Sequence, residues 1–144
     1  KRIDNLEVIS KGNNDITTNL DKKVEEKVFD YLKNYYPDFG YFGEESGIEG
    51  INDKDQYWVL DPLDGTRNFA YQYPHYDLSL ACISEGKVIC AVIIDPVRDD
   101  VFCAGEGTGS LLNNKRIRSS NKKTLTNAML TNVGHSNQNQ NYSY

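Results

Sequence analysis

The chain has 144 residues, 38% hydrophobic and 26% charged, which is the composition of one folded domain rather than of a fibrous or disordered protein. Its net charge of −5 argues against a nucleic-acid binder with a basic surface and against a polybasic membrane anchor. No apolar run approaches the roughly 20 residues that a membrane-spanning helix needs. Three cysteines without a Cys-x-x-Cys pair predict buried free thiols in a reducing compartment. We therefore expect a cytoplasmic protein with no nucleic-acid or membrane partner.

A single long helix is predicted near the start of the chain, over residues 18–36. Thr18 and Asp21 have the spacing of a capping box, and Pro37 stops the helix. Lysine and glutamate residues fill one side of the helix, as expected for a side that faces water. Apolar side chains recur on the other side at spacings of four and three and predict one buried face, formed by Val24, Val28, Leu32 and Tyr35.

The rest of the chain is predicted to be mostly β-structure. The turns between the predicted strands are short, and short turns imply antiparallel neighbours. The expected strands cover residues 41–43, 57–60, 77–84, 87–94, 101–104, 111–118 (a hairpin broken at Asn113-Asn114) and 129–133. The expected irregular segments are residues 1–10, a polar turn at 11–14 and a polar excursion at 48–55.

An acidic turn, with the sequence DPLDGT at residues 61–66, follows the predicted strand at 57–60. Its proline fixes one backbone angle and its glycine permits a sharp bend, so the turn can direct Asp61 and Asp64 to one point. Two neighbouring carboxylates repel each other unless a proton or a divalent cation lies between them. Oxygen ligands, to which the carbonyl of Leu63 can be added, favour Mg²⁺ or Ca²⁺ over zinc.

The acidic turn leads into a predicted short helix at residues 66–70, and the first N–H groups, from Gly65 and Thr66, would form an anion site. Metal ligands beside a phosphate site are the components of a phosphoryl-transfer centre. For this motif alone, an ordinary turn with a helix-capping aspartate is the alternative. An EF-hand loop is excluded because its first acid would fall on Leu60. A haloacid dehalogenase-type phosphatase is excluded because its nucleophile would fall on Pro62.

Three further acids are candidates for the same site. Glu44 and Glu45 follow the short strand predicted at 41–43, where they form either a surface turn or a part of the acidic site. Asp21 has the position of a helix-capping residue, and a capping carboxylate can also hold a hydroxyl such as that of Thr66. The two roles of Asp21 do not exclude each other.

Taken together, these residues resemble the inositol monophosphatase family of Mg²⁺-dependent phosphatases. The resemblance is carried by the acidic pair and serine at 44–46, the segment WVLDPLDGT at 58–66 and the Asn-Phe pair that follows it. Asp21 matches the upstream acid of the family, and Lys11 matches its preceding lysine. The similarity extends to about residue 133, and the joint pattern is far more specific than any of its pieces.

The resemblance implies a layered αβαβα sugar-phosphatase fold of the α/β (α+β) class, usually a homodimer. This chain would supply the N-terminal helix and the mostly antiparallel half of the sheet. Two or three Mg²⁺ ions, replaceable by Mn²⁺, and inhibition by lithium are also implied. Glu44, Asp61 and the Leu63 carbonyl would bind the first metal, and Asp61 with Asp64 the second. Glu45 and Lys11 are implied to lie around these metal ligands and to support them without binding the metal.

The same resemblance implies a mechanism in which a metal-activated water attacks the phosphorus of a small phosphorylated substrate. The catalytic residues would be Thr66, Asp21 and Glu44, with Thr66 paired to Asp21 and both Thr66 and Glu44 orienting the water. The phosphate would be bound by the amides of Gly65 and Thr66, beside Asp64.

The domain of the family is nearly twice as long as this chain, and its second half supplies a further metal-binding aspartate and most sugar contacts. We therefore expect residues 1–133 to be the N-terminal catalytic part, residues 134–144 a polar mobile loop or tail, and the C-terminal part to be absent. The expected reaction is hydrolysis of inositol 1-monophosphate to inositol and phosphate. The alternatives are 3′-phosphoadenosine 5′-phosphate or fructose 1,6-bisphosphate as substrate, or a non-catalytic interaction protein that retains the fold.

Overall fold

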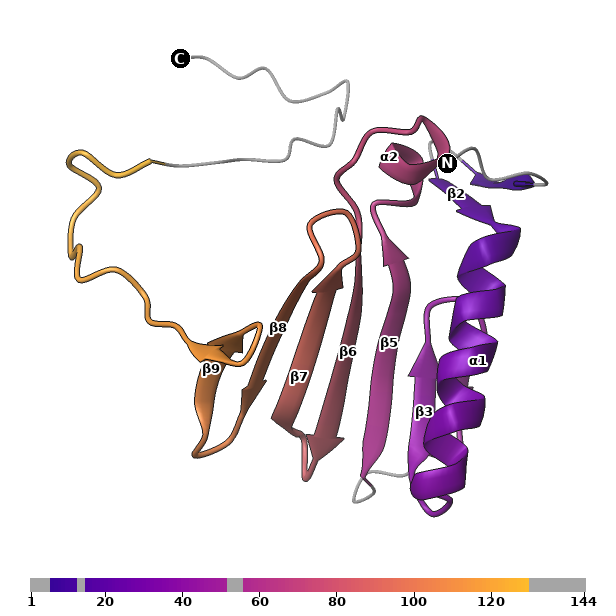
Figure 1. Ribbon diagram of the computed structural model, residues 1–144. Coiled ribbons are helices and arrows are strands. Elements are labelled where there is room, and N and C mark those ends of the chain that lie inside the picture. The colour runs from indigo at the N-terminus through magenta and orange to yellow at the C-terminus, as the bar shows by residue number, and fades with distance from the viewer. Residues whose placement is uncertain (1–5, 13–14, 52–55, 130–144) are drawn as a thin grey trace.

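The computed structural model describes residues 6–12, 15–51 and 56–129, and in this part of the chain it contains two helices and ten strands (Figure 1). Neither described helix has the length and apolarity that crossing a membrane would require. The elements in chain order are β1 (Val8–Gly12), β2 (Asp15–Thr18), α1 (Asn19–Tyr35), β3 (Gly40–Gly43), β4 (Gly47–Glu49), β5 (Tyr57–Asp64), α2 (Thr66–Ala70), β6 (Asp77–Ser84), β7 (Lys87–Asp95), β8 (Asp100–Gly105), β9 (Gly109–Leu112) and β10 (Lys115–Arg116).

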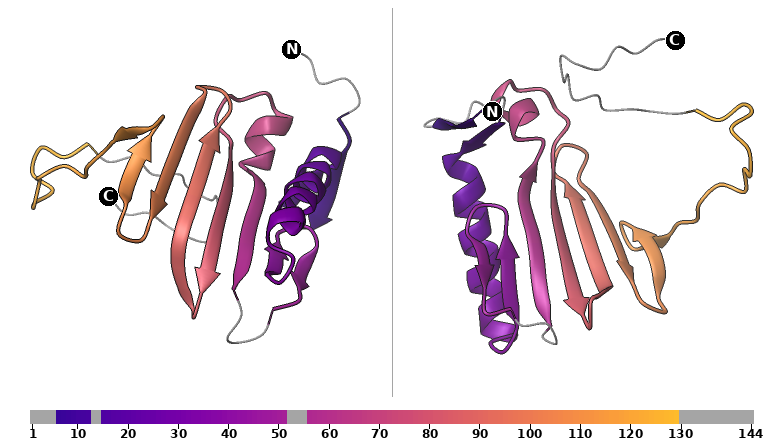
Figure 2. Two further views of the ribbon diagram at one scale, coloured as in Figure 1. Left: turned by 60° about the horizontal axis from the view of Figure 1, so that its bottom comes forward. Right: turned by 180° about the vertical axis from the view of Figure 1, so that it is seen from behind.

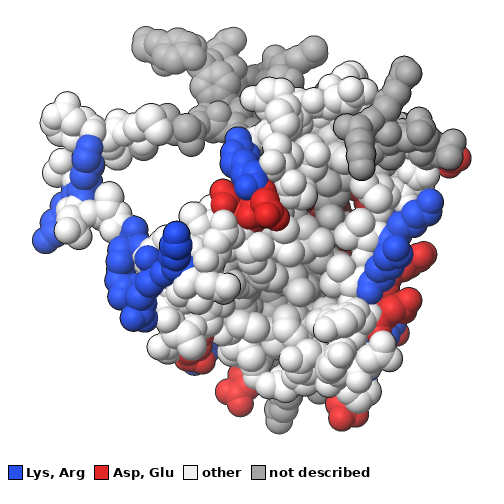
Figure 3. Space-filling view, in the orientation of Figure 1, with Lys and Arg blue, Asp and Glu red and all other residues white. Residues whose placement is uncertain are grey.

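Most of the chain forms one eight-stranded sheet, in the order β10-β9-β8-β7-β6-β5-β3-β4. Its pairs are antiparallel except for β3 and β5, which run parallel. Helix α1 lies against the β3–β5 end of the sheet, and β1 and β2 form a separate two-stranded sheet beside its first turn (Figures 1 and 2). The predicted combination of an N-terminal helix with a mostly antiparallel sheet is confirmed. In the view of Figure 3, the sheet surface beside α1 carries few charged side chains.

Helix α1 begins and ends where the sequence predicted. Thr18 is the N-cap, the capping box with Asp21 is complete, and Tyr36 is the C-cap. The predicted buried face is wrong in part, because Val24 and Val28 are only half-buried and Tyr35 is 64% exposed. The residues of α1 that are buried are Asp21, Glu25, Phe29 and Leu32.

The buried face of α1 differs from the prediction because two of its four members are acids. Apolar periodicity assigns acids to the solvent side, and it therefore placed the buried face one position away. Here Asp21 and Glu25 are buried with partners, because other segments of the chain donate hydrogen bonds to their carboxylates. Below them, Phe29 packs its ring 5.2 Å from that of Tyr41, and both belong to the core with Leu60.

The predicted strands agree with the structure where turn signals are strong. Helix α2 and strand β6 have the predicted bounds, and β7, β8 and the β9–β10 hairpin lie within a few residues of them. Asn113 and Asn114 both have positive φ angles, 48° and 65°, as the tight turn between β9 and β10 requires. Met129 lies in no strand, and the rest of the strand predicted at 129–133, like the tail at 134–144, lies outside the described residues.

Three strands were not predicted. β1 occupies residues that were expected to be irregular or a polar turn. β2 lies between that turn and the predicted helix, and its last residue, Thr18, was expected in the helix. β4 overlaps the start of the expected polar excursion. All three are short and polar, so their pairing rather than their own sequence determines them. β5 is also longer than expected, because it continues through the acidic turn to Asp64. Of the cysteines, Cys82 is buried as predicted, whereas Cys90 and Cys103 are half-buried.

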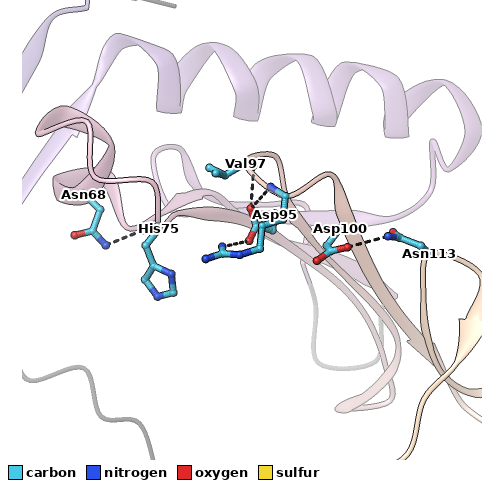
Figure 4. A network of polar contacts seen from close by, with 7 residues as sticks. Asn68, His75, Asp95, Val97, Asp100 and Asn113 are labelled. Atoms are coloured by element: carbon cyan, nitrogen blue, oxygen red, sulfur yellow. Dashed lines mark hydrogen bonds and ion pairs between the residues drawn. The ribbon is translucent and has the colours of Figure 1, made fainter.

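Side-chain hydrogen bonds fix the connections of β7 and β8 (Figure 4). Oδ1 of Asp95 accepts the N–H groups of Val97 (2.9 Å) and Arg98 (3.0 Å), and the Arg98 guanidinium donates to Oδ2. The hydrogen bond from Arg98 lowers the pKa of Asp95. Beyond the turn, Asn113 donates to Asp100 over 2.8 Å and so joins β8 to the end of β9. These bonds fix the turn between β7 and β8, which lies at the same end of the sheet as α2 (Figure 1).

Candidate active site

The candidate site lies where the parallel pairing of β3 with β5 ends. Their register pairs Gly43 with Leu60, so the next residues, Glu44 and Asp61, follow at the same end of the sheet. The Glu44 N–H donates to the Leu60 carbonyl over 3.2 Å and so extends the pairing beyond β3. Because parallel strands bring their carboxyl ends together, two acids that are distant in sequence become neighbours.

Asp61 lies among other acids. Partial burial raises the pKa of the Asp61 carboxyl, and the charges of Asp64 and Asp21 raise it further. Hydrogen bonds that the Asp61 carboxyl accepts from the Glu44 side chain and from the Leu63 N–H lower its pKa, and the Leu63 N–H reaches Asp61 Oδ1 over 3.1 Å. Two carboxyl groups as close as those of Glu44 and Asp61 favour a shared proton or a cation between them.

Asp21 connects the start of α1 to the acidic turn. Its side chain is 0% exposed, and its Oδ2 accepts the N–H of Thr18 over 3.0 Å and also the Thr18 hydroxyl. Its Oδ1 accepts the hydroxyl of Thr66 over 3.1 Å. The predicted pairing of Asp21 with Thr66 is present in the structure, and the catalytic role of the pair stays a prediction.

The hydroxyl of Thr66 has a second acceptor within reach. The carbonyl oxygen of Leu63 lies 3.0 Å from Thr66 Oγ1. A hydroxyl carries one hydrogen, so it donates either to Asp21 or to Leu63 at any moment. When Asp21 accepts the hydrogen, the Leu63 carbonyl keeps both lone pairs for another ligand, and the Thr66 oxygen is free to accept a hydrogen bond.

Gly65 makes the sharp bend that the sequence predicted. It has a φ of 86°, in the left-handed region, and it is the N-cap of α2. A Cβ at this position would lie 2.9 Å from the carbonyl oxygen of His75. That oxygen is fixed by Asn68, which donates to it over 2.7 Å (Figure 4). Glycine is therefore required here both by the backbone angle and by the close approach of the following loop.

Asp64 is exposed and has a different neighbour from Asp61. An irregularity in the β5–β6 register separates the two acids, and beyond it Asp64 pairs with Asp77. Burial raises the pKa of Asp77, as do the charges of Asp64, Asp61 and Asp95, while His75 opposes them. Sequence reasoning missed Asp77, although it begins a correctly predicted strand, because only the pairing of β5 with β6 places it beside the acidic turn.

The segment after Glu44 is held by α1 and β2. The carboxylate of Glu45 accepts the hydroxyl of Thr17 over 2.8 Å. Glu25, from the buried face of α1, accepts the N–H groups of Glu45 and Ser46 over 2.9 and 2.8 Å. Sequence reasoning missed Glu25, because an acid in an amphipathic helix is expected to face water. The side chain of Lys11 lies outside the described part of the structure.

The described residues contain no group of three or more His, Cys, Asp or Glu side chains placed to hold one metal ion. Glu44 and Asp64 both act on the Asp61 carboxyl, and Asp64 also pairs with Asp77 across the sheet. The expected convergence of Glu44, Asp61 and Asp64 on metal ions stays a prediction. The donors that the site does offer are carboxylate and carbonyl oxygens, and these fit Mg²⁺ in chemical type.

The sequence profile of the inositol monophosphatase family matches residues 2–143 of the chain. The chain belongs to the inositol monophosphatase family. The resemblance that the motifs indicated is therefore confirmed, and it covers nearly the whole chain.

Individual members of the family show the same fold. The chain is 41% identical over 128 residues to the Nus factor SuhB of Escherichia coli (strain K12), which covers 88% of the chain and 48% of that protein. The extragenic suppressor protein suhB of Bartonella henselae is 37% identical, with a TM-score of 0.80 over 84% of the chain and 47% of that structure. An IMPase/NADP phosphatase complexed with Mg²⁺ and phosphate is 27% identical, with a TM-score of 0.72 over 78% of the chain and 43% of that structure. The chain thus spans about half the length of these relatives.

Proposed function

We propose that this member of the inositol monophosphatase family is a Mg²⁺-dependent phosphomonoesterase of the cytoplasm. The observation that carries the proposal is the buried carboxylate of Asp21, which holds the Thr66 hydroxyl at the site where Glu44 and Asp61 meet. The relative complexed with Mg²⁺ and phosphate supports the phosphatase class and the metal. The leading substrate is inositol 1-monophosphate, which would give inositol and phosphate.

The proposed metal ligands are the oxygen donors at the ends of β3 and β5. Glu44, Asp61 and the Leu63 carbonyl would hold one Mg²⁺, and Asp61 with Asp64 a second. Mg²⁺ bound there would neutralise charge on the phosphate and lower the pKa of a water molecule, so that a nucleophile forms near neutral pH. Mn²⁺ also prefers oxygen ligands and would substitute for it.

Thr66 would orient the attacking water. With its hydrogen donated to Asp21, the Thr66 oxygen can accept a hydrogen bond from the water, and Glu44 can accept the proton as a general base. Asp21 cannot easily turn away, because its second oxygen is bound to Thr18. The water would then attack phosphorus while the bond to the leaving oxygen breaks, and the leaving alkoxide would take up a proton from solvent, matching the one that Glu44 removes from the water. The binding of phosphate by the amides of Gly65 and Thr66 stays a prediction.

The experiment that tests the proposal measures phosphate release from inositol 1-monophosphate by the full-length gene product. Activity should require Mg²⁺ or Mn²⁺, disappear in excess EDTA and fall with lithium. Thr66→Ala should lower kcat by about 10²–10⁴-fold, whereas Thr66→Ser, which keeps the hydroxyl, should lose much less. Undiminished turnover in EDTA would contradict the proposal. Parallel assays with 3′-phosphoadenosine 5′-phosphate, fructose 1,6-bisphosphate and NADP would rank the substrates.

A second candidate function is a non-catalytic interaction protein that retains the fold. It is favoured by one observation, the name Nus factor SuhB of the Escherichia coli relative, which does not describe a phosphatase. The two candidates differ in metal binding, because an interaction protein has no need of a divalent cation beside Asp61.

A homodimer is likewise a proposal from the family, and sedimentation equilibrium of the full-length gene product would test it.

A further inference from the structure

Glu25 is a buried carboxylate outside the set of residues to which the proposed mechanism gives a role. It is 3% exposed and lies one helical turn after Asp21 on the buried face of α1. Its two oxygens accept two successive backbone N–H groups: Oε2 that of Glu45 over 2.9 Å and Oε1 that of Ser46 over 2.8 Å. A carboxylate used in this way fixes the position of a backbone segment, because both hydrogen bonds are charge-assisted and neither can be lost without burying an unpaired group.

The residue that these bonds position is Glu44. On its N-terminal side, the Glu44 N–H donates to the Leu60 carbonyl of β5 over 3.2 Å. On its C-terminal side, the next two N–H groups are held by Glu25. The peptide that carries Glu44 is therefore fixed at both ends, once to the strand that supplies Asp61 and once to the helix that supplies Asp21.

Gly43 provides the space in which the Glu25 carboxylate lies. A Cβ on Gly43 would lie 2.5 Å from Glu25 Oε1, a distance at which one of the two groups must move. The Glu25 carboxylate can therefore make its two hydrogen bonds only because residue 43 has no side chain. Any side chain at position 43 would push the carboxylate away from the segment that it holds.

We propose that Glu25 is a positioning residue that acts through the backbone of residues 44–46 and sets the place of the Glu44 carboxylate beside Asp61. This inference rests on the proposed function, in which Glu44 is a metal ligand. Helix α1 then positions both parts of the site from successive turns: Asp21 holds the Thr66 hydroxyl, and Glu25 holds the Glu44 segment. A carboxylate that only anchored this segment for stability would make the same contacts, so the test must separate stability from metal binding.

The first test compares Glu25→Gln with Glu26→Gln, a matched control at an exposed position of the same helix. Glutamine keeps the size of the side chain but turns an N–H toward one of the two backbone N–H groups. In the full-length gene product, Mn²⁺ binding measured by calorimetry should weaken by about 10–100-fold in Glu25→Gln and stay unchanged in Glu26→Gln. The Mg²⁺ concentration for half-maximal phosphate release should rise in parallel.

The second test uses Gly43→Ala alone and combined with Glu25→Ala. Gly43→Ala should displace the carboxylate and lower both the thermal midpoint and Mn²⁺ affinity. Removing the Glu25 side chain makes room for the added methyl group, so the double variant should regain part of the thermal midpoint but none of the Mn²⁺ affinity. If the Mn²⁺ affinity changed in proportion to the thermal midpoint across all variants, Glu25 would serve stability alone, and the inference would be overturned.

The outcomes for the two proposals are distinguishable. Wild-type protein that hydrolyses phosphomonoesters and binds Mn²⁺, with Glu25→Gln equal to Glu26→Gln, would overturn the role of Glu25 and leave the proposed function intact. Wild-type protein that neither hydrolyses them nor binds Mn²⁺ would overturn the proposed function, and the role of Glu25 would fall with it.

Discussion

Replacing Asp21 by asparagine tests whether its charge serves the fold or the chemistry. The carboxylate has two oxygens with different tasks: Oδ2 accepts from Thr18 and completes the capping box, and Oδ1 accepts from Thr66. Asparagine has one oxygen and one NH₂ group, so only one task can be kept. With the NH₂ group toward Thr18, two donors would face each other and the cap would be lost, at a cost of about 0.5–2 kcal/mol.

The opposite orientation keeps the cap and changes the chemistry. With the NH₂ group toward Thr66, the amide donates to Thr66 Oγ1, and the Thr66 hydrogen moves to the Leu63 carbonyl, which is 3.0 Å away. The oxygen that should orient the water is then already occupied by the amide. We therefore expect Asp21→Asn to lower kcat by about 10²–10⁴-fold. Stability should fall by no more than about 2 kcal/mol, since the cap is kept.

The assay combines phosphate release with thermal unfolding of the full-length gene product. Asp30→Asn is the matched control, because Asp30 is an exposed acid on the same helix and the substitution removes the same charge. It should leave both kcat and the unfolding midpoint close to those of the wild type. If Asp21→Asn kept wild-type kcat while folding normally, the interpretation of the Asp21–Thr66 pair as catalytic would be refuted.

Three further predictions concern single positions. Asp64→Asn should nearly abolish turnover, because it removes the charge of a proposed metal ligand, and it should leave the fold intact, because asparagine has the shape of aspartate. Wild-type activity in saturating Mg²⁺ would show that the acidic turn is structural. Gly65→Ala should destabilise the protein far more than Gly107→Ala, because both have positive φ angles (86° and 74°) but only Gly65 has a backbone carbonyl within 2.9 Å of the added methyl; equal midpoints in thermal unfolding would refute this. Burial raises the pKa of the Cys82 thiol from 9.0 to about 11, so the unfolded chain ionises first and stability should fall as pH rises from about 9 to about 11. Alkaline unfolding curves of the wild type and Cys82→Ala check this, and identical slopes would contradict it.

The parts of the fold that local chemistry controls could be predicted from the sequence. The bounds of α1 follow from Thr18 and Asp21 at one end and Pro37 at the other, and the β9–β10 turn follows from Asn113 and Asn114. Such signals act within a few residues, so no knowledge of the tertiary structure is needed. Short polar strands such as β1, β2 and β4 have no comparable signal, because only the partner strand makes their backbone bonds favourable.

The candidate site divides in the same way. Asp61, Gly65 and Thr66 stand in one contiguous motif, and the sequence was sufficient to nominate them. Glu25 was missed because its role depends on the position of residues 45 and 46, which come from another strand end. The buried face of α1 was misjudged for the same reason, since a buried carboxylate looks like a solvent-facing one until its donors are known.

The parallel pairing of β3 and β5 has a consequence for how the length of this chain can vary. Glu44 and Asp61 each follow a register that is fixed by backbone pairs from Gly40 with Tyr57 to Gly43 with Leu60. An insertion of one residue within either strand would shift one acid by about 3.3 Å against the other and turn its side chain to the opposite face. An insertion in the connection between β4 and β5 changes neither the β3–β5 register nor the face of the sheet on which the side chains of Glu44 and Asp61 lie. Natural length variation in this region should therefore concentrate in that connection and avoid the two strands, and a peptide tag placed there should leave the acids in register.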